Sequence, residues 1–159
     1  MTFNLTKDQI EIQQRARQIA STLVAENAVE VDKSEQYPWD NVKALTDAGF
    51  VGMTIPKEYG GPGRSFLEAN LVVEEMAAYC GPTGRIAVEA NMGAISAVMH
   101  YGTDFQKRLA AELVLAGDKP AICITEPDAG SAASQMTTRA DKRGDKYCLL
   151  YTSDAADDP

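Results

Sequence analysis

The stretch that decides the fold runs from residue 121 to residue 131 and reads AICITEPDAGS. Residues 121–125 are mainly apolar and end at Thr125, which predicts a buried strand. Pro127 and Gly130 then predict a tight turn that presents backbone N–H groups and the hydroxyl of Ser131, and small residues let a phosphate approach such a backbone closely. The residues alone leave two interpretations open. The turn cradles a pyrophosphate, with Thr125 hydrogen-bonding a planar polar ring, or it is an ordinary connection between strands.

Helical patterns precede this stretch. Capping boxes, in which a Ser or Thr is followed three residues later by Glu or Gln, predict helix starts at Thr6, Ser65 and Thr103. We expect the first helix to run to about residue 24 and the polar residues 27–37 to form a connection. The apolar face of the first helix is expected to consist of Ile10, Ala16, Ile19, Ala20, Leu23 and Val24.

The remaining helices are bounded by glycine and proline. A short helix from Pro38 should end at Gly49 and turn Val42, Leu45 and Ala48 inward. The helix from Ser65 should run to about residue 80 and bury Leu71, Val72, Met76 and Ala77. Residues 81–84 are interpreted as a break, after which a helix covers residues 85–100, and the helix that begins at Thr103 should end at Gly117.

Residues 137–140 and 146–149 predict two strands around the polar turn 141–145. A helical region therefore leads into the start of a β region. The last residues, 152–159, contain three Asp and no large apolar side chain, so we expect them to be disordered.

The composition favours a soluble globular protein, since 45% of the residues are hydrophobic and 24% are charged. A net charge of -8 disfavours nucleic acid as a partner. Cys80, Cys123 and Cys148 are odd in number and widely spaced, which argues against a disulfide framework and a zinc site, and Cys123 is expected to be buried and inert. We find no signal-peptide pattern and no apolar run near the ~20 residues of a membrane helix, and we expect a cytoplasmic protein without a membrane partner.

A family resemblance rests on the string CITEPDAGS, residues 123–131, which resembles the flavin-binding signature of acyl-CoA dehydrogenases and follows a helical region as it does there. IPKEYGG at residues 55–61, EEM at 74–76 and Gly102 also match, and the resemblance covers about residues 3–149. It implies a mainly α fold, an N-terminal helical bundle followed by the first strands of a truncated β-barrel domain. The implied domains are residues 1–117, helical; residues 118–149, an incomplete middle β-domain; and residues 150–159, a tail foreign to the family.

The resemblance also implies an FAD cofactor. Ile122, Ile124 and Thr125 match positions that line the flavin ring, and Gly130 and Ser131 match positions at the FAD pyrophosphate and the CoA thioester. Members of the family typically dehydrogenate an acyl-CoA thioester between Cα and Cβ, here expected to be short-chain. They use a carboxylate base, pass electrons to an electron-transfer flavoprotein and form homo-oligomers. We expect the base to lie beyond this chain, so that the chain alone is inactive.

This sequence departs from the family pattern at two places. Ala132 stands where many members carry Asp, and Leu150 and Tyr151 replace an Asn-Gly turn.

The segment from Arg85 to Ile95 resembles the family helix that lines the acyl pocket, and it implies substrate contacts by Arg85, Val88, Met92, Ile95 and, from the later turn, Ser131. Arg85 is either a solvated surface residue or a guanidinium aimed at an anionic acyl end, for which its planar donor fork suits carboxylate or sulfinate. Residues 36–42, 84–86, 115–120 and 130–134 resemble the 3-sulfinopropanoyl-CoA desulfinase branch of the superfamily, which implies the release of sulfite as an alternative reaction.

A different class of function also remains open, a non-catalytic helical interaction module. Some residues are interpreted as structural. These are Glu74 and Glu75 on a helix, His100 at a helix end, Trp39 as an anchor between surface and core, and Met53, Met76 and Met99 as core or pocket filling.

Overall fold

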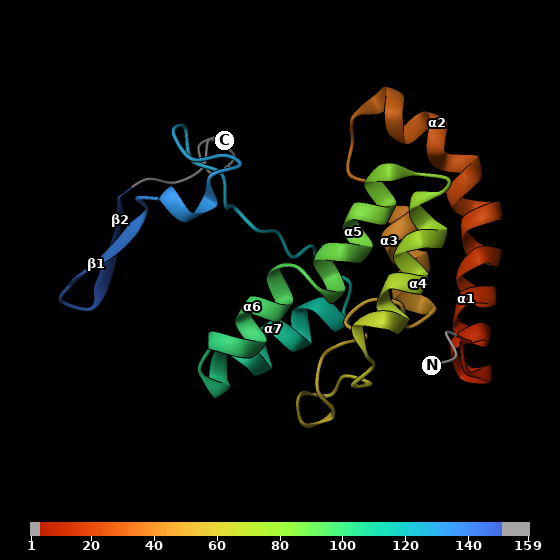
Figure 1. Ribbon diagram of the computed structural model, residues 1–159, viewed down its shortest axis with the longest axis horizontal. Coiled ribbons are helices and arrows are strands. Elements are labelled where there is room, and N and C mark those ends of the chain that lie inside the picture. The colour runs from red at the N-terminus through yellow and green to blue at the C-terminus, as the bar shows by residue number, and fades with distance from the viewer. Residues whose placement is uncertain (1–3, 151–159) are drawn as a thin grey trace. The chain divides into compact units, whose positions relative to one another are not determined.

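A computed structural model describes residues 4–150, and contacts within it divide the chain into two units, Met1–Ala121 and Ile122–Pro159. Figure 1 labels the elements of both. The chain is mainly α-helical with strands near its C-terminal end, as expected from the sequence. Among the described residues, no helix is long and apolar enough to cross a membrane.

The first unit begins with a long helical run. Helix α1 (Lys7–Ile19) continues through a π-helical turn (Ala20–Val24) into helix α2 (Ala25–Ser34) (Figure 1). The expected capping box at Thr6 is confirmed, because the Thr6 hydroxyl accepts from the backbone N–H of Gln9 at 3.2 Å and the Gln9 side chain accepts from the N–H of Thr6 at 3.0 Å.

The π turn keeps one face of this helical run on the core. The fully buried residues are Ile12, Ala16, Ala20 and Val24, each four residues from the last. Four residues overshoot one α-helical turn by about 40°, so this spacing would drift around a pure α-helix. The wider turn, closed by a bond from the Ala25 N–H to the Ala20 carbonyl, takes up part of that drift. The expectation that Ile10 faces the core is wrong, because its side chain is 40% exposed.

The expected connection over residues 27–37 is also wrong, because α2 extends to Ser34. It ends where Glu35 adopts a left-handed φ of 54°. None of the residues of α2 is buried. A polar sequence therefore misled the interpretation: α2 continues an already nucleated helix and contains good helix formers such as Ala25 and Glu26, so it needs no apolar face of its own.

Helix α3 (Trp39–Asp47) leads into an irregular buried segment. Val42 and Leu45 are buried as expected, and the loop that follows places Phe50, Met53 and Ile55 in the core before a short 3-10 turn (Lys57–Tyr59). Asn91 holds this loop, since its side chain donates to the carbonyl of Phe50 at 2.9 Å and accepts from the N–H of Met53 at 2.7 Å.

Helix α4 (Phe66–Ala77) starts at the capping box of Ser65 and buries Leu71, Val72 and Met76, as expected. Ala77, which was also expected to be buried, is exposed. Glu75 is structural, as expected: its buried carboxylate pairs with both Nε and Nη2 of Arg17 on α1, at 2.9 and 2.7 Å. This pair joins α4 to α1, its neighbour in the bundle.

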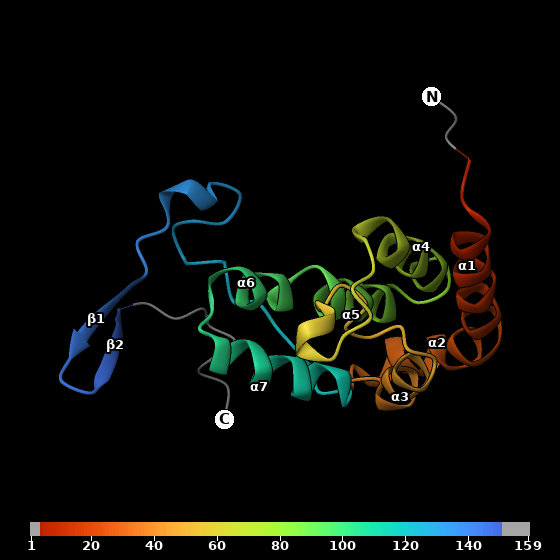
Figure 2. The same cartoon turned by 90° about the horizontal axis from the view of Figure 1, so that it is seen from below.

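The single helix expected over residues 85–100 is two helices, α5 (Gly81–Asn91) and α6 (Ala94–Tyr101). Pro82 lies in the first turn of α5, where a missing N–H breaks no hydrogen bond, so the Gly-Pro pair opens the helix rather than interrupting it. The break lies at Gly93, where an added Cβ would clash with the Glu89 carboxylate. Helix α7 (Asp104–Leu115) starts at the Thr103 capping box and lies beside α6 (Figure 2).

The second unit contains an antiparallel hairpin. Strands β1 (Arg139–Arg143) and β2 (Lys146–Leu150) pair with Arg143 opposite Lys146, and Gly144, with φ of 66°, lies in the two-residue turn. The hairpin confirms that two strands form here, but the expected turn at residues 141–145 is wrong, because residues 141–143 belong to β1 and pair with β2. Part of the expected tail, residues 151–159, lies outside the described residues.

The buried strand expected at residues 121–125 is not formed. Ile122 and Ile124 are 42% and 48% exposed, and Cys123, expected to be buried, is exposed. Among residues 4–150 the sheet consists of β1 and β2, so this apolar segment has no neighbouring strand that would bury it. The pattern of apolar residues was correctly recognised, but burial also requires a partner.

Candidate functional site

Arg85 lies in the first turns of α5 with its side chain 66% exposed, and it forms an ion pair with Glu89 one turn later. Glu89 is buried, and its second oxygen accepts from the backbone N–H of Ala94 at 3.2 Å, which caps α6. The Glu89 carboxylate therefore fixes the guanidinium relative to the junction of α5 and α6. Arg85 is therefore an exposed surface residue whose guanidinium is paired with the buried Glu89 carboxylate.

An open cavity of about 390 Å³ lies beside Arg85. The last turn of α2, the connection before α3 and the first turns of α5 form its walls. The lining residues are Val31, Glu35, Gln36, Tyr37, Pro38, Pro82, Arg85 and Ile86. The other expected substrate residues do not line it. Val88 and Met92 are half-buried, and Ile95 is in the core with 2% of its surface exposed.

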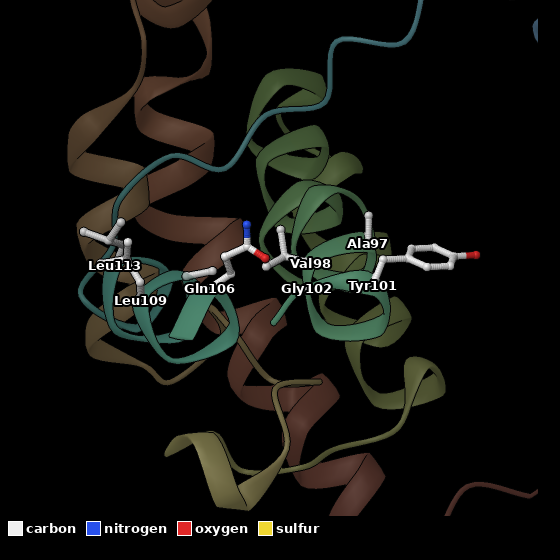
Figure 3. Close-up of a pocket in the computed structure, with 8 residues that line it drawn as sticks. Ala97, Val98, Tyr101, Gly102, Gln106, Leu109 and Leu113 are labelled. Atoms are coloured by element: carbon white, nitrogen blue, oxygen red, sulfur yellow. The ribbon is translucent and has the colours of Figure 1, made fainter. Parts of the chain in front are cut away.

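A second, larger groove lies between α6 and α7, with a volume of about 540 Å³ (Figure 3). Its lining is mostly apolar and consists of Ala97, Val98, Tyr101, Gly102, Gln106, Leu109, Ala110 and Leu113. In Figure 3 the Gln106 amide lies between the leucines of α7 and the side chains of α6. The sequence analysis missed this groove, although Leu109 and Leu113, one turn apart, gave the signal. Because most of the lining residues are apolar, the groove can bury apolar surface of a ligand or a partner. The lining residues include no carboxylate or imidazole that could transfer a proton.

The expected cofactor residues lie in the second unit. Five exposed residues make up this set. Ile122, Ile124 and Thr125 lie in a segment without regular secondary structure, and Gly130 and Ser131 follow the turn. Gly130 has no positive φ, and a Cβ added to it would meet no atom within 4 Å. Neither backbone conformation nor steric crowding within the described residues requires glycine at position 130. The Gly130 backbone is therefore open to an approaching ligand.

The sequence analysis missed Glu126, which is 7% exposed between exposed neighbours. Its carboxylate accepts from the backbone N–H of Thr137 at 2.8 Å, from the Thr137 hydroxyl at 3.0 Å and from the backbone N–H of Thr138 at 2.7 Å. The hydrogen bond from the Thr137 N–H, followed by those from the other donors, lowers the pKa of Glu126 to about 2. These bonds also explain why β1 begins at Arg139, two residues later than expected, because the preceding N–H groups are directed to Glu126.

These residues fit the chemistry of FAD. Ile122 and Ile124 offer apolar surface to a flat ring, and the Thr125 hydroxyl can hydrogen-bond its polar edge. The open backbone at Gly130 and the hydroxyl of Ser131 suit a pyrophosphate. Metal chemistry has no comparable donor set among residues 4–150, where no group of three His, Cys, Asp or Glu side chains could hold an ion.

The chain is similar to known proteins along most of its length. The chain is 60% identical over 147 residues to 3-sulfinopropanoyl-CoA desulfinase of Variovorax paradoxus, covering 92% of this chain and 37% of that protein. It is 35% identical over 150 residues to the short-chain specific acyl-CoA dehydrogenase of Clostridium acetobutylicum, covering 94% of this chain and 40% of that protein. The chain thus spans about two fifths of the length of these relatives.

A solved structure of a glutaryl-CoA dehydrogenase from Mycobacterium smegmatis in complex with FADH2 has a similar fold. The TM-score is 0.80 at 27% sequence identity, covering 91% of this chain and 38% of that one. The family of the acyl-CoA dehydrogenase N-terminal domain matches residues 6–118, which include all the helices from α1 to α7. On these grounds the chain belongs to the acyl-CoA dehydrogenase family.

Proposed function

We propose that this chain is the N-terminal part of an FAD-dependent enzyme that acts on a short-chain acyl-CoA thioester with an anionic acyl end. The observation that carries the proposal is the position of Arg85, an exposed guanidinium held by Glu89 beside an open cavity. A charged donor fork at the edge of a cavity suits a carboxylate or sulfinate group. Identity of 60% to a 3-sulfinopropanoyl-CoA desulfinase supports sulfinate as that group and sulfite release as the reaction.

A second candidate is dehydrogenation of a short-chain acyl-CoA, supported by the 35% identity to a short-chain acyl-CoA dehydrogenase. This candidate needs a base and an electron acceptor, for which an electron-transfer flavoprotein is the expected partner. The names of both relatives describe enzymes, and this disfavours the non-catalytic helical module.

In this proposal, a residue of the first unit binds the acyl group and residues of the second unit bind the cofactor. Arg85 would bind and orient the anionic end of the acyl group, with Glu89 limiting the rotation of the guanidinium. In the second unit, Ile122, Ile124 and Thr125 would hold the flavin ring, and Gly130 and Ser131 would bind phosphate and thioester oxygens. FAD, when bound, supplies a planar ring that can accept a hydride. We further propose that residues 118–149 begin a β-domain, and that the whole protein is a cytoplasmic homo-oligomer.

The test compares two substrates in the full-length protein. Arg85→Ala should lower kcat/KM for a sulfinate-bearing acyl-CoA by about 10- to 150-fold, since loss of a charge-assisted hydrogen bond costs about 1.5–3 kcal/mol. For butyryl-CoA the loss should stay within about threefold. Arg108→Ala is the matched control, because Arg108 also pairs with an acidic residue one helical turn away, Asp104 on α7.

Equal losses for the two substrates would contradict recognition of an anion by Arg85. The FAD assignment has a separate readout, the visible absorbance of the purified full-length protein. A protein without flavin absorbance that also takes up no added FAD would contradict the cofactor while leaving the substrate test valid.

A further inference from the structure

The loop between residues 126 and 137 is held by one carboxylate. Glu126 accepts hydrogen bonds from Thr137 and Thr138, eleven and twelve residues later, at 2.7–3.0 Å. Its backbone also pairs with Ala129, with N···O distances of 3.3 Å and 3.1 Å. Glu126 thus fixes the loop at both ends, by its main chain at Ala129 and by its side chain at the start of β1.

Among the described residues of this unit, no other side chain hydrogen-bonds across the loop. Among the described residues 122–150, the three bonds to Glu126 are the side-chain hydrogen bonds, and the one ion pair joins Arg139 and Asp141 within β1. A carboxylate suits the position because all three partners are donors. An amide offers a single oxygen, and its NH2 group would face a further donor.

The loop held in this way contains the two residues expected at the phosphates. Gly130 and Ser131 follow directly on Ala129, the residue whose backbone Glu126 pairs with. Both are exposed, and no side-chain hydrogen bond among the described residues fixes them. A short 3-10 turn, Ala133–Gln135, follows them and is held by its own backbone hydrogen bonds. The backbone geometry of Gly130 and Ser131 therefore depends on the pairing at Ala129 before them and on how the bonds at Thr137 and Thr138 anchor the segment after them.

We propose that Glu126 is a positioning residue that holds the Gly130–Ser131 backbone in the conformation that binds the pyrophosphate of a dinucleotide. Glu126 does not touch the ligand, and acts by closing the loop that presents the binding backbone. The nature of the ligand rests on the proposed function, whereas the closure of the loop does not.

The first experiment needs no ligand and uses the 159-residue chain. Amide hydrogen exchange is measured across residues 126–138 in Glu126→Gln and in the control Asp128→Asn, which removes the same charge from an exposed position of the same loop. Glu126→Gln should accelerate exchange at Thr137, Thr138 and Ala129 by at least tenfold, and the control should leave it within twofold. Unchanged exchange in Glu126→Gln overturns the proposal.

The second experiment measures FAD binding to the full-length protein by flavin fluorescence. Glu126→Gln should raise the Kd for FAD by about tenfold or more, and Asp128→Asn should not change it. Faster exchange together with an unaltered Kd overturns the positioning role. If the unsubstituted protein binds no FAD, the cofactor assignment fails and the positioning role fails with it, while the exchange result still decides whether Glu126 closes the loop.

Discussion

At the residue scale, the three donors around Glu126 predict an unusual acid titration. They bind the ionised carboxylate, which lowers its pKa from an ordinary 4.5 to about 2. Because the folded-state pKa is depressed, the contribution of these bonds to stability is complete above pH 4.5 and is lost as the pH falls through about 2. The amide proton shift of Thr138, followed by NMR in the Asp128→Asn background, should titrate with a midpoint near 2. A midpoint near the ordinary value would show that the bonds do not form.

Residue identity alone made part of the site predictable. The Thr-Glu-Pro motif and the glycine turn pointed to residues 125–131, of which Thr125, Gly130 and Ser131 are exposed and Glu126 and Ala129 are buried. That these residues bind a ligand stays a prediction. The role of Glu126 was not predicted, because its partners Thr137 and Thr138 lie outside the motif. They donate mainly through backbone N–H groups, which every residue except proline has and which therefore form no sequence pattern. The pairing of Arg85 with Glu89 was visible as a four-residue spacing, but the capping bond to Ala94 depends on the helix break.

At the element scale, the capping box of α7 gives a measurable prediction. The Thr103 hydroxyl accepts from the N–H of Gln106 at 3.3 Å, and the Gln106 side chain accepts from the N–H of Thr103 at 2.8 Å. Thr103→Ala should lower the free energy of unfolding by about 1 kcal/mol in urea denaturation. Thr22→Ala is the control, because Thr22 is exposed inside the helical run and its hydroxyl donates back to the Gln18 carbonyl. The control should change stability little, and equal losses in both variants would count against a capping role.

Helix starts were predicted better than helix ends for a physical reason. All three capping boxes are satisfied in the structure, since each rests on contacts within one turn of the chain. The wrong predictions concern elements whose structure depends on contacts with residues distant in the sequence or on the preceding helix. Helix α2 persists without a buried face, and the break at Gly93 depends on the Glu89 carboxylate that occupies the space of a side chain. The segment 121–125 has the pattern of a buried strand but lacks a partner strand among the described residues.

At the scale of the whole molecule, the two units differ in what they bury. The main core cluster consists of residues between Ile12 and Val114, all in the first unit. In the second unit, the buried residues among those described are Glu126 and Ala129. Burial of apolar surface is the dominant favourable term in folding, so the first unit contains the main source of folding free energy among the described residues.

This difference leads to a prediction about truncation. A chain of residues 1–121 should retain its helical circular dichroism signal and unfold in one cooperative transition, because its core lies within its own elements. Leu45→Ala in the truncated chain tests the cause, since Leu45 is fully buried and its truncation should cost about 2–5 kcal/mol. Leu67→Ala on the exposed face of α4 serves as the control and should change stability by less than about 1 kcal/mol. A gradual transition that neither variant shifts would mean that residues 1–121 do not form this core on their own.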